Sequence, residues 1–283
     1  MQDIKKQILD AFPGIELEPI AHKYYINNKD LNLNSVSKAK ARFKKKTDWN
    51  VIQKAISKRD NRTVESIQAE WDYKRWLGNT KGTYLHEYIE FALEGEGLPK
   101  WDKAVFDLHP KDLYLYFDHM NYIIMQADEY LKDFSQFTYI GSEVMMYDLD
   151  YGISGTFDKI FGDEERGICI RDYKTDKQFH MQDDPHKFRK NLTGPLSHLI
   201  ECEHVIYSLQ QCIYKNILEK NTDIRVPVEN IELVWFHPEN RTHKVYPILD
   251  LTHEAQEILN LYGSEYNGTI KPKTEDILKL PKF

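Results

Sequence analysis

The spacing of apolar residues divides the chain into a helical first half and a second half in which strands and helices mix. Helical spacing over residues 3–12 ends at Pro13-Gly14, a stop signal for a helix. Weak alternation over residues 15–33, with a turn at Asn27–Asp30, predicts a hairpin. Ser35 or Ser37 is then expected to cap a short basic helix.

Helical spacing of apolar residues resumes at Trp49 and continues to Glu94. It predicts two or three helices there, with breaks near Asp60-Asn61 and at Gly78-Asn79. One more helix is predicted over residues 111–134.

After Phe137 the pattern changes to short apolar runs that alternate and are separated by turn residues. The predicted strands cover residues 139–149, 152–162, 167–175, 231–238 and 244–251. Helices are predicted over 199–219 and 253–263. Helices followed by a strand meander, a helix and further strands are typical of an α/β or α+β domain.

Composition limits the kinds of partner. The 283 residues are 41% hydrophobic, enough for a sizeable core in one large domain or a domain with an insertion. Lys and Arg number 38 against 45 Asp and Glu, so the formal net charge is −7. This argues against a surface that binds nucleic acid or membranes everywhere, and a polyanionic partner would need a local basic patch.

Three cysteines without a C-x-x-C pair indicate a reduced, intracellular protein without a disulfide framework or a cysteine-built metal site. The first residues lack the apolar run of a signal peptide, and no stretch reaches 18 apolar residues. We therefore expect a cytoplasmic protein with no membrane contact.

The chemistry is concentrated in two adjacent predicted strands. Alternation places Asp172 and Lys174 on the same face of one strand as Ile168 and Ile170. Asp158 lies near the end of the preceding strand, so two carboxylates and a lysine are expected to converge. Such a group suits Mg²⁺ or Mn²⁺. The alternative is an ordinary cross-strand ion pair on a solvated face.

Two helices carry further polar pairs at a spacing of four residues. His86 and Glu90 share one helix face, and Gln210 and Tyr214 share another. Taken alone, a histidine of this kind is also consistent with a core or surface role. The second pair is equally consistent with an ordinary amphipathic helix.

In order, these motifs resemble those of the PD-(D/E)XK nuclease superfamily, specifically its RecB-like exonuclease branch, which includes the mitochondrial genome maintenance exonuclease. The matching segments are G-T-Y-L-H-E-Y-I-E (82–90), Glu143, G-T-F-D (155–158), D-Y-K-T (172–175) and Q-Q-C-I-Y (210–214). The resemblance spans about Ser35 to Tyr214. It implies a restriction-endonuclease-like core, a central mixed sheet flanked by helices, with a helical N-terminal subdomain.

The resemblance also implies roles for single residues. His86, Asp158, Asp172 and the Tyr173 carbonyl would hold one or two Mg²⁺ or Mn²⁺ ions, and the imidazole favours Mn²⁺. Lys174 would be the catalytic lysine, and Glu143 an acidic residue of the site. Gln210 and Tyr214 would support the site and the DNA backbone, while Glu90 would hold His86 or a water.

The function that follows is a metal-dependent DNA exonuclease acting on single strands or DNA ends in replication, recombination or repair. Residues 1–135 would form the N-terminal hairpin and the helical region with the histidine helix, and 136–283 the nuclease core, together one unit. The alternatives are a structure-specific endonuclease of the same superfamily and a non-catalytic nucleic-acid-binding subunit.

Two motifs found in some related nucleases are missing from this sequence, and their absence narrows the subfamily to which it is similar. The cysteines exclude the iron–sulfur members of the branch, and GNTKGT lacks the ending of an ATP-binding phosphate loop. No ATP use is expected, so a helicase or recombination partner would be a separate protein. A nuclease without a helicase suits the cytoplasm of a bacterial or phage-infected cell.

Two basic segments are candidates for phosphate contact. They contain Lys44, Lys45 and Lys46 in the first, and Lys187, Arg189 and Lys190 in the second. Each could also be a solvated surface. Trp71, Tyr73 and Trp76 could stack on bases or pack in the core.

Overall fold

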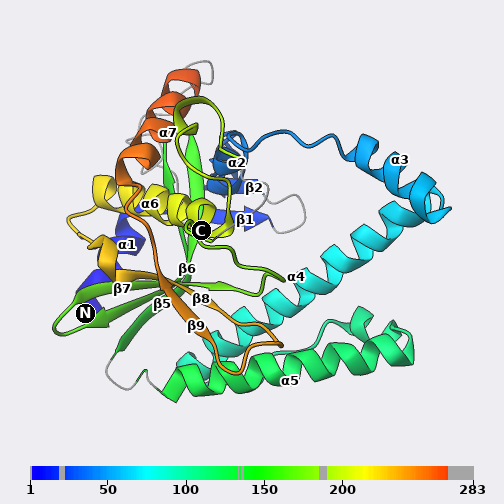
Figure 1. The fold of residues 1–283 in the computed structure, drawn as a ribbon. Helices are drawn as coiled ribbons and strands as arrows, with labels where there is room; N and C mark the ends of the chain where they lie inside the picture. The colour runs from blue at the N-terminus through cyan, green and yellow to red at the C-terminus, as the bar shows by residue number, and fades with distance from the viewer. Residues whose placement is uncertain (1, 19–22, 133, 135–136, 185–189, 267–283) are drawn as a thin grey trace.

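A mixed β-sheet forms the centre of the protein, which is therefore of the α/β class (Figure 1). The structure, a computed structural model, describes residues 2–18, 23–132, 134, 137–184 and 190–266. The strands of the sheet, in spatial order, are β4 (Asn34–Ser35), β6 (Ile153–Asp163), β7 (Gly167–Lys174), β8 (Ile231–Trp235) and β9 (Lys244–Pro247). β5 (Thr138–Asp148) also pairs with β6. The β4–β6 and β7–β8 pairs are parallel and the others are antiparallel.

The N-terminal segment forms a separate small sheet. Helix α1 (Gln2–Ala11) precedes the antiparallel strands β1 (Ile15–Glu18), β2 (Lys23–Ile26) and β3 (Lys29–Asp30). The predicted hairpin is present, but its turn is shorter than expected. Asn27 and Asn28 make the turn with φ of 49° and 62°, which asparagine tolerates better than most residues. Lys29 and Asp30 then pair with β2 as a third strand.

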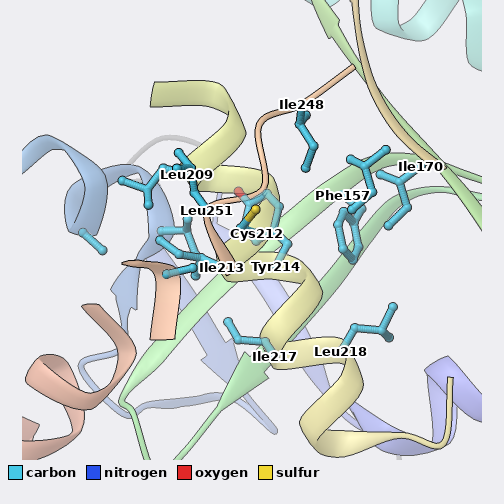
Figure 2. Packing of buried hydrophobic residues seen from close by; sticks show 14 of the residues in the cluster. Phe157, Ile170, Leu209, Cys212, Ile213, Tyr214, Ile217, Leu218, Ile248 and Leu251 are labelled. Carbon is cyan, nitrogen blue, oxygen red and sulfur yellow. The ribbon is translucent and has the colours of Figure 1, made fainter. Parts of the chain in front are cut away.

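Helices cover both faces of the main sheet. On one face lie α2 (Val36–Ala41), α6 (Glu203–Asn221) and α7 (Thr252–Glu265). The buried cluster there joins Leu209 and Ile213 of α6 to Phe157 and Ile170 of the sheet (Figure 2). On the other face, α4 (Val64–Glu94) and α5 (Pro110–Lys132) enclose Tyr173, Val234 and Phe236. Alternate residues of β7 and β8 are therefore buried on opposite faces.

Polar side chains define where the N-terminal helices begin. Ser35, rather than Ser37, caps α2 by accepting from the Lys38 N–H. Asp48 caps α3 (Trp49–Asp60), which ends at left-handed Asn61, and Thr63 caps α4. Figure 1 shows α3 at the end of α4 that points away from the sheet. The predicted break near Asp60-Asn61 is therefore confirmed.

The predicted break at Gly78-Asn79 is wrong, because α4 is one helix of 31 residues. A glycine inside a helix costs about 1 kcal/mol relative to alanine, but it keeps the backbone hydrogen bond. The next turns bury Tyr84, Leu85 and Ile89 against the core, and this packing outweighs the cost. Helix α6 begins at Glu203, four residues after its predicted start.

Short 3₁₀ turns also occur at Lys103–Asp107, Gly194–Leu196 and Val228–Asn230. The predicted boundary at residue 135 falls between α5 and β5, and the segment before it supplies β4 to the main sheet. Within the described part of the chain, no helix combines the length and apolar character needed to cross a membrane.

Candidate functional site

The site begins where strands β6 and β7 separate. Their ladder ends at the pair Lys159–Arg171, so Asp158 and Asp172 are the next residues on the two strands. Beyond this point the Tyr173 N–H donates to Asp158 Oδ2 at 2.9 Å instead of to a strand carbonyl. Asp158 lies in the middle of β6 and not near its end as expected, because β6 continues along β5.

Helix α4 brings His86 to this fork. Its Nε2 lies 3.2 Å from the Tyr173 carbonyl oxygen and 3.7 Å from Asp158 Oδ2. Its Nδ1 lies 3.5 Å from Glu143 Oε1. One ligand atom each from His86, Glu143 and Asp158 lies within 4.8 Å of the others. Burial lowers the pKa of His86, but Asp158 and Glu143 oppose this more strongly, and the pKa is raised overall.

The donor types at this cluster fit a divalent cation. Two carboxylates, an imidazole and a backbone carbonyl are oxygen and nitrogen donors of the kind that Mg²⁺ and, with the imidazole, Mn²⁺ accept. The adjacent Asp172 also has a buried Oδ1 without a hydrogen-bond partner among the described residues. A buried carboxylate oxygen in this state is costly unless something pairs with it.

Glu143 reaches the cluster through an unusual backbone conformation. It lies on β5 between the pairs Ser142–Lys159 and Val144–Phe157, and Asp158 lies between the same two pairs on β6. Its φ is 46°, in the left-handed region that glutamate rarely adopts. Backbone strain of this kind tends to occur at functional sites, and here it accompanies a partly exposed carboxylate beside His86.

Asp172 and Lys174 form a buried ion pair beside the cluster. Lys174 Nζ lies 2.5 Å from Asp172 Oδ2, and the Asp172 side chain is 1% exposed. Burial raises the pKa of Asp172 to about 6, although Lys174 draws it downward. Burial lowers the pKa of Lys174, but Asp172 and Asp158 raise it more, so it stays above its ordinary value. The lysine is therefore held as a cation.

The predicted ligands and the observed cluster overlap without being identical. The family resemblance predicts as metal ligands His86, Asp158, Asp172 and the Tyr173 carbonyl. The structure brings His86, Asp158 and that carbonyl together and adds Glu143. The carboxylate of Asp172 faces Lys174 instead. Glu90, expected to hold His86 or a water, accepts a hydrogen bond from the fully buried Lys159 at 3.1 Å.

Lys40 belongs to the same basic segment as Lys44, but the sequence did not predict that its side chain reaches the site. Its Nζ donates to Gln210 Oε1, and Gln210 Nε2 donates to the Tyr214 hydroxyl at 3.2 Å. The ammonium groups of Lys40 and Lys174 both lie over the Tyr207 ring, 4.9 and 4.7 Å from its centroid. The available signal was spacing, because Lys40 follows the buried Val36 by four residues and so shares its helix face.

Two further motif residues pack close together. A Cβ on Gly82 of α4 would lie 3.3 Å from the hydroxyl of Thr175, directly after β7. The G-T-x-x-H and D-Y-K-T segments are thus in contact. The glycine lets α4 approach the end of β7, which is where His86 meets Tyr173.

Four of the six lysines and arginines predicted to contact nucleic acid lie in the described part of the chain. Lys44, Lys45 and Lys46 are exposed after α2, and Lys190 is also exposed. Lys187 and Arg189 lie outside the described residues.

The three aromatic residues before the histidine are half-buried. Trp71 makes an edge contact with Trp49, and Tyr73 stacks with Trp76 at 6.2 Å between ring centroids.

A cavity of about 340 Å³ adjoins Lys174. Arg75 and Gly78 of α4 line one side, and Lys177 and Tyr207 contribute to the other. Gly78 leaves this side open, because a Cβ there would meet no atom within 4 Å. The cavity therefore places Arg75 and Lys177, together with the carboxylate of Asp176, next to the Asp172–Lys174 pair.

No protein-family model matches the chain, and a search of curated proteins finds no match to it.

Proposed function

We propose that the protein is a metal-dependent DNA exonuclease with a restriction-endonuclease-like core, related to the RecB-like branch of the PD-(D/E)XK nucleases. One observation carries the proposal. His86, Glu143 and Asp158 surround one point at the β6–β7 fork, with the Asp172–Lys174 ion pair directly beside it. An ordinary surface ion pair would not be buried and would not adjoin a histidine and two more carboxylates.

The residues of the fork have distinct chemical roles in this proposal. A divalent ion held by His86, Glu143, Asp158 and the Tyr173 carbonyl would lower the pKa of a bound water and offset charge on the scissile phosphate. Asp172 would complete the oxygen donors on the β7 side. Lys174, kept protonated by Asp172, would donate a hydrogen bond to the attacking water or to a phosphate oxygen.

Lys40 would add a second cation near the same phosphate. Gln210 holds its ammonium group, and Tyr214 in turn holds Gln210. The exposed Lys44, Lys45 and Lys46 and the Arg75–Lys177 cavity would neutralise neighbouring phosphates. Such contacts confine DNA to one side of a protein whose net charge is −7.

The test is a cleavage assay. The protein is incubated with end-labelled single-stranded and double-stranded DNA in Mg²⁺, Mn²⁺ or EDTA, and with a circular single strand. We expect a ladder of shortened products with a metal ion, none with EDTA, and an intact circle. Opening of the circle would indicate an endonuclease. Binding without cleavage in either metal would indicate a non-catalytic subunit.

A further inference from the structure

A second cavity, of about 330 Å³, lies between α1 and β5. Its volume falls in the lower part of the range of small-ligand pockets. Ile8, Leu9 and Phe12 of α1 form one wall, and Ile140, Val144 and Met145 of β5 form the other. Pro13 to Ile15 border it as the chain leaves α1.

The walls are apolar and partly open to solvent. Ile8 and Phe12 are buried, whereas Leu9 is 62% exposed, among the most exposed large apolar residues of the described chain. An exposed leucine at the rim of an apolar cavity leaves contact area that a ligand could cover.

Polar groups occur at the rim. Lys5, Glu94 and Ser142 line the cavity there, and the Tyr139 hydroxyl donates to Glu94 Oε1 at 2.9 Å. A flat ligand with apolar faces and polar edges would meet complementary groups on both. Nucleobases have this character.

Glu143 connects this cavity to the candidate metal centre, the cluster of His86, Glu143 and Asp158. It lines the cavity, and its Oε1 is also the carboxylate oxygen 3.5 Å from His86 Nδ1. A ligand that contacts both sides of Glu143 would have a phosphate at the metal centre and a group bonded to that phosphate in the cavity. In a nucleic acid strand, that group is a nucleoside.

We propose that the α1–β5 cavity binds the nucleoside attached to the phosphate at the metal centre, at the end of the DNA strand. The base lies against Leu9 and Met145, and its edge faces Ser142 and Glu94. The assignment rests on the proposed nuclease function, and it adds a subsite that distinguishes a nucleotide from a bare phosphate.

The test compares two probes, thymidine 5′-monophosphate and inorganic phosphate, each titrated into the full chain with Mn²⁺ by calorimetry. We expect the nucleotide to bind at least about tenfold more tightly than phosphate. Leu9→Asn should reduce that ratio by about threefold or more, because an apolar wall is lost, and leave phosphate binding unchanged. Leu98→Asn is the matched control, since Leu98 is 73% exposed and does not line the cavity.

A Leu9→Trp variant provides a second measurement, because the larger ring would fill the mouth of the cavity and also lower the ratio. Thermal unfolding of each variant checks that the fold persists. Equal affinities for the two probes, no binding of either probe, or a ratio that neither Leu9 variant changes would overturn the subsite. Failure of the nuclease proposal has a different signature, the absence of DNA cleavage in every metal and substrate tested.

Discussion

The ring of Tyr214 lies directly over Gly155. A Cβ added to this glycine would come within 2.2 Å of the tyrosine Cε1 atom. Gly155 begins the G-T-F-D segment that carries Asp158, and Tyr214 ends the segment that carries Gln210. Two motifs that are distant in the sequence therefore interlock, and the glycine is required by contact with α6 and not by its own backbone.

Gly155→Ala should therefore destabilise the protein by overpacking. The methyl group would force the ring of Tyr214 or strand β6 to shift, at a cost of about 1–3 kcal/mol. For a protein of this size, that lowers the melting temperature by several degrees, roughly 2–4 °C per kcal/mol. Thermal denaturation by circular dichroism measures the shift. An unchanged melting temperature would contradict the contact.

Gly78→Ala should have the opposite effect. Gly78 lies inside α4, and a Cβ there would meet nothing within 4 Å. Alanine restricts the unfolded chain without creating a clash, so we expect a gain of about 0.5–1 kcal/mol in the free energy of unfolding. Urea titration of the wild type and the two glycine variants gives both signs in one experiment. A loss of stability at Gly78 would show that its surroundings are closed.

Lys174→Ala and Asp172→Asn should each reduce DNA cleavage by at least about a hundredfold while the protein stays folded. Lys174→Ala removes the ammonium group from the fork, and Asp172→Asn removes the carboxylate that pairs with it. Initial rates on a labelled oligonucleotide measure the loss. Lys215→Ala is the control, because Lys215 is also buried and paired, with Glu219 on α6. Cleavage at the wild-type rate in either site variant would contradict the assigned roles.

Glu143→Gln should weaken Mn²⁺ binding by at least about tenfold, the effect typical even of residues that only orient metal ligands. The amide removes the negative charge beside His86 without changing the size of the side chain. Calorimetric titration with Mn²⁺ measures the change, and Glu129→Gln on the exposed side of α5 is the control. Equal affinities in the two variants would remove Glu143 from the metal site.

The charge of Lys40 should make DNA binding depend on pH. Burial, together with the nearby Lys174 and Lys44, lowers the pKa of Lys40 to about 7, against the opposing effect of Asp172 and Asp176. A DNA phosphate beside Lys40 would stabilise its ammonium form. Above the pKa, Lys40 must therefore take up a proton when DNA binds, and the affinity for DNA falls as the pH rises. Between about pH 6 and 8 this one group can account for up to about tenfold in affinity.

Lys40→Arg is the variant that isolates this effect, because arginine stays protonated throughout the range. The ratio of the two dissociation constants for single-stranded DNA, measured in EDTA to prevent cleavage, should change with pH. Histidines that titrate in both proteins cancel in this ratio. Parallel pH curves would show that Lys40 does not approach a phosphate.

Local patterns were sufficient for part of the site. Alternation along β7 predicted that Asp172 and Lys174 share a face with Ile168 and Ile170, and the register and burial of the strand confirm it. The spacing of four residues between Gln210 and Tyr214 likewise predicted a shared helix face, and the two side chains are hydrogen-bonded.

Other features required information from distant parts of the chain. The continuity of α4 through Gly78 depends on the packing of its later turns, which local propensity does not include. The contact of Lys40 with Gln210 was not predicted, because the two residues are 170 positions apart in the chain. Glu90 was expected to hold His86 or a water, but Glu90 pairs with Lys159, and Glu143 lies beside His86 instead. These contacts depend on which strand packs against each turn of α4.

Sequence alone thus determined the approximate positions of most helices and strands and the residue types available for chemistry, because periodicity and motif spacing are local properties of the chain. Only the tertiary structure decided which side chains meet. The β6–β7 fork, the left-handed backbone conformation of Glu143 within β5 and the cavity between α1 and β5 arise where non-local segments pack. Packing of the surrounding core holds Asp158, Asp172 and Glu143 close together, although bringing carboxylates together is unfavourable unless cationic groups offset their charge.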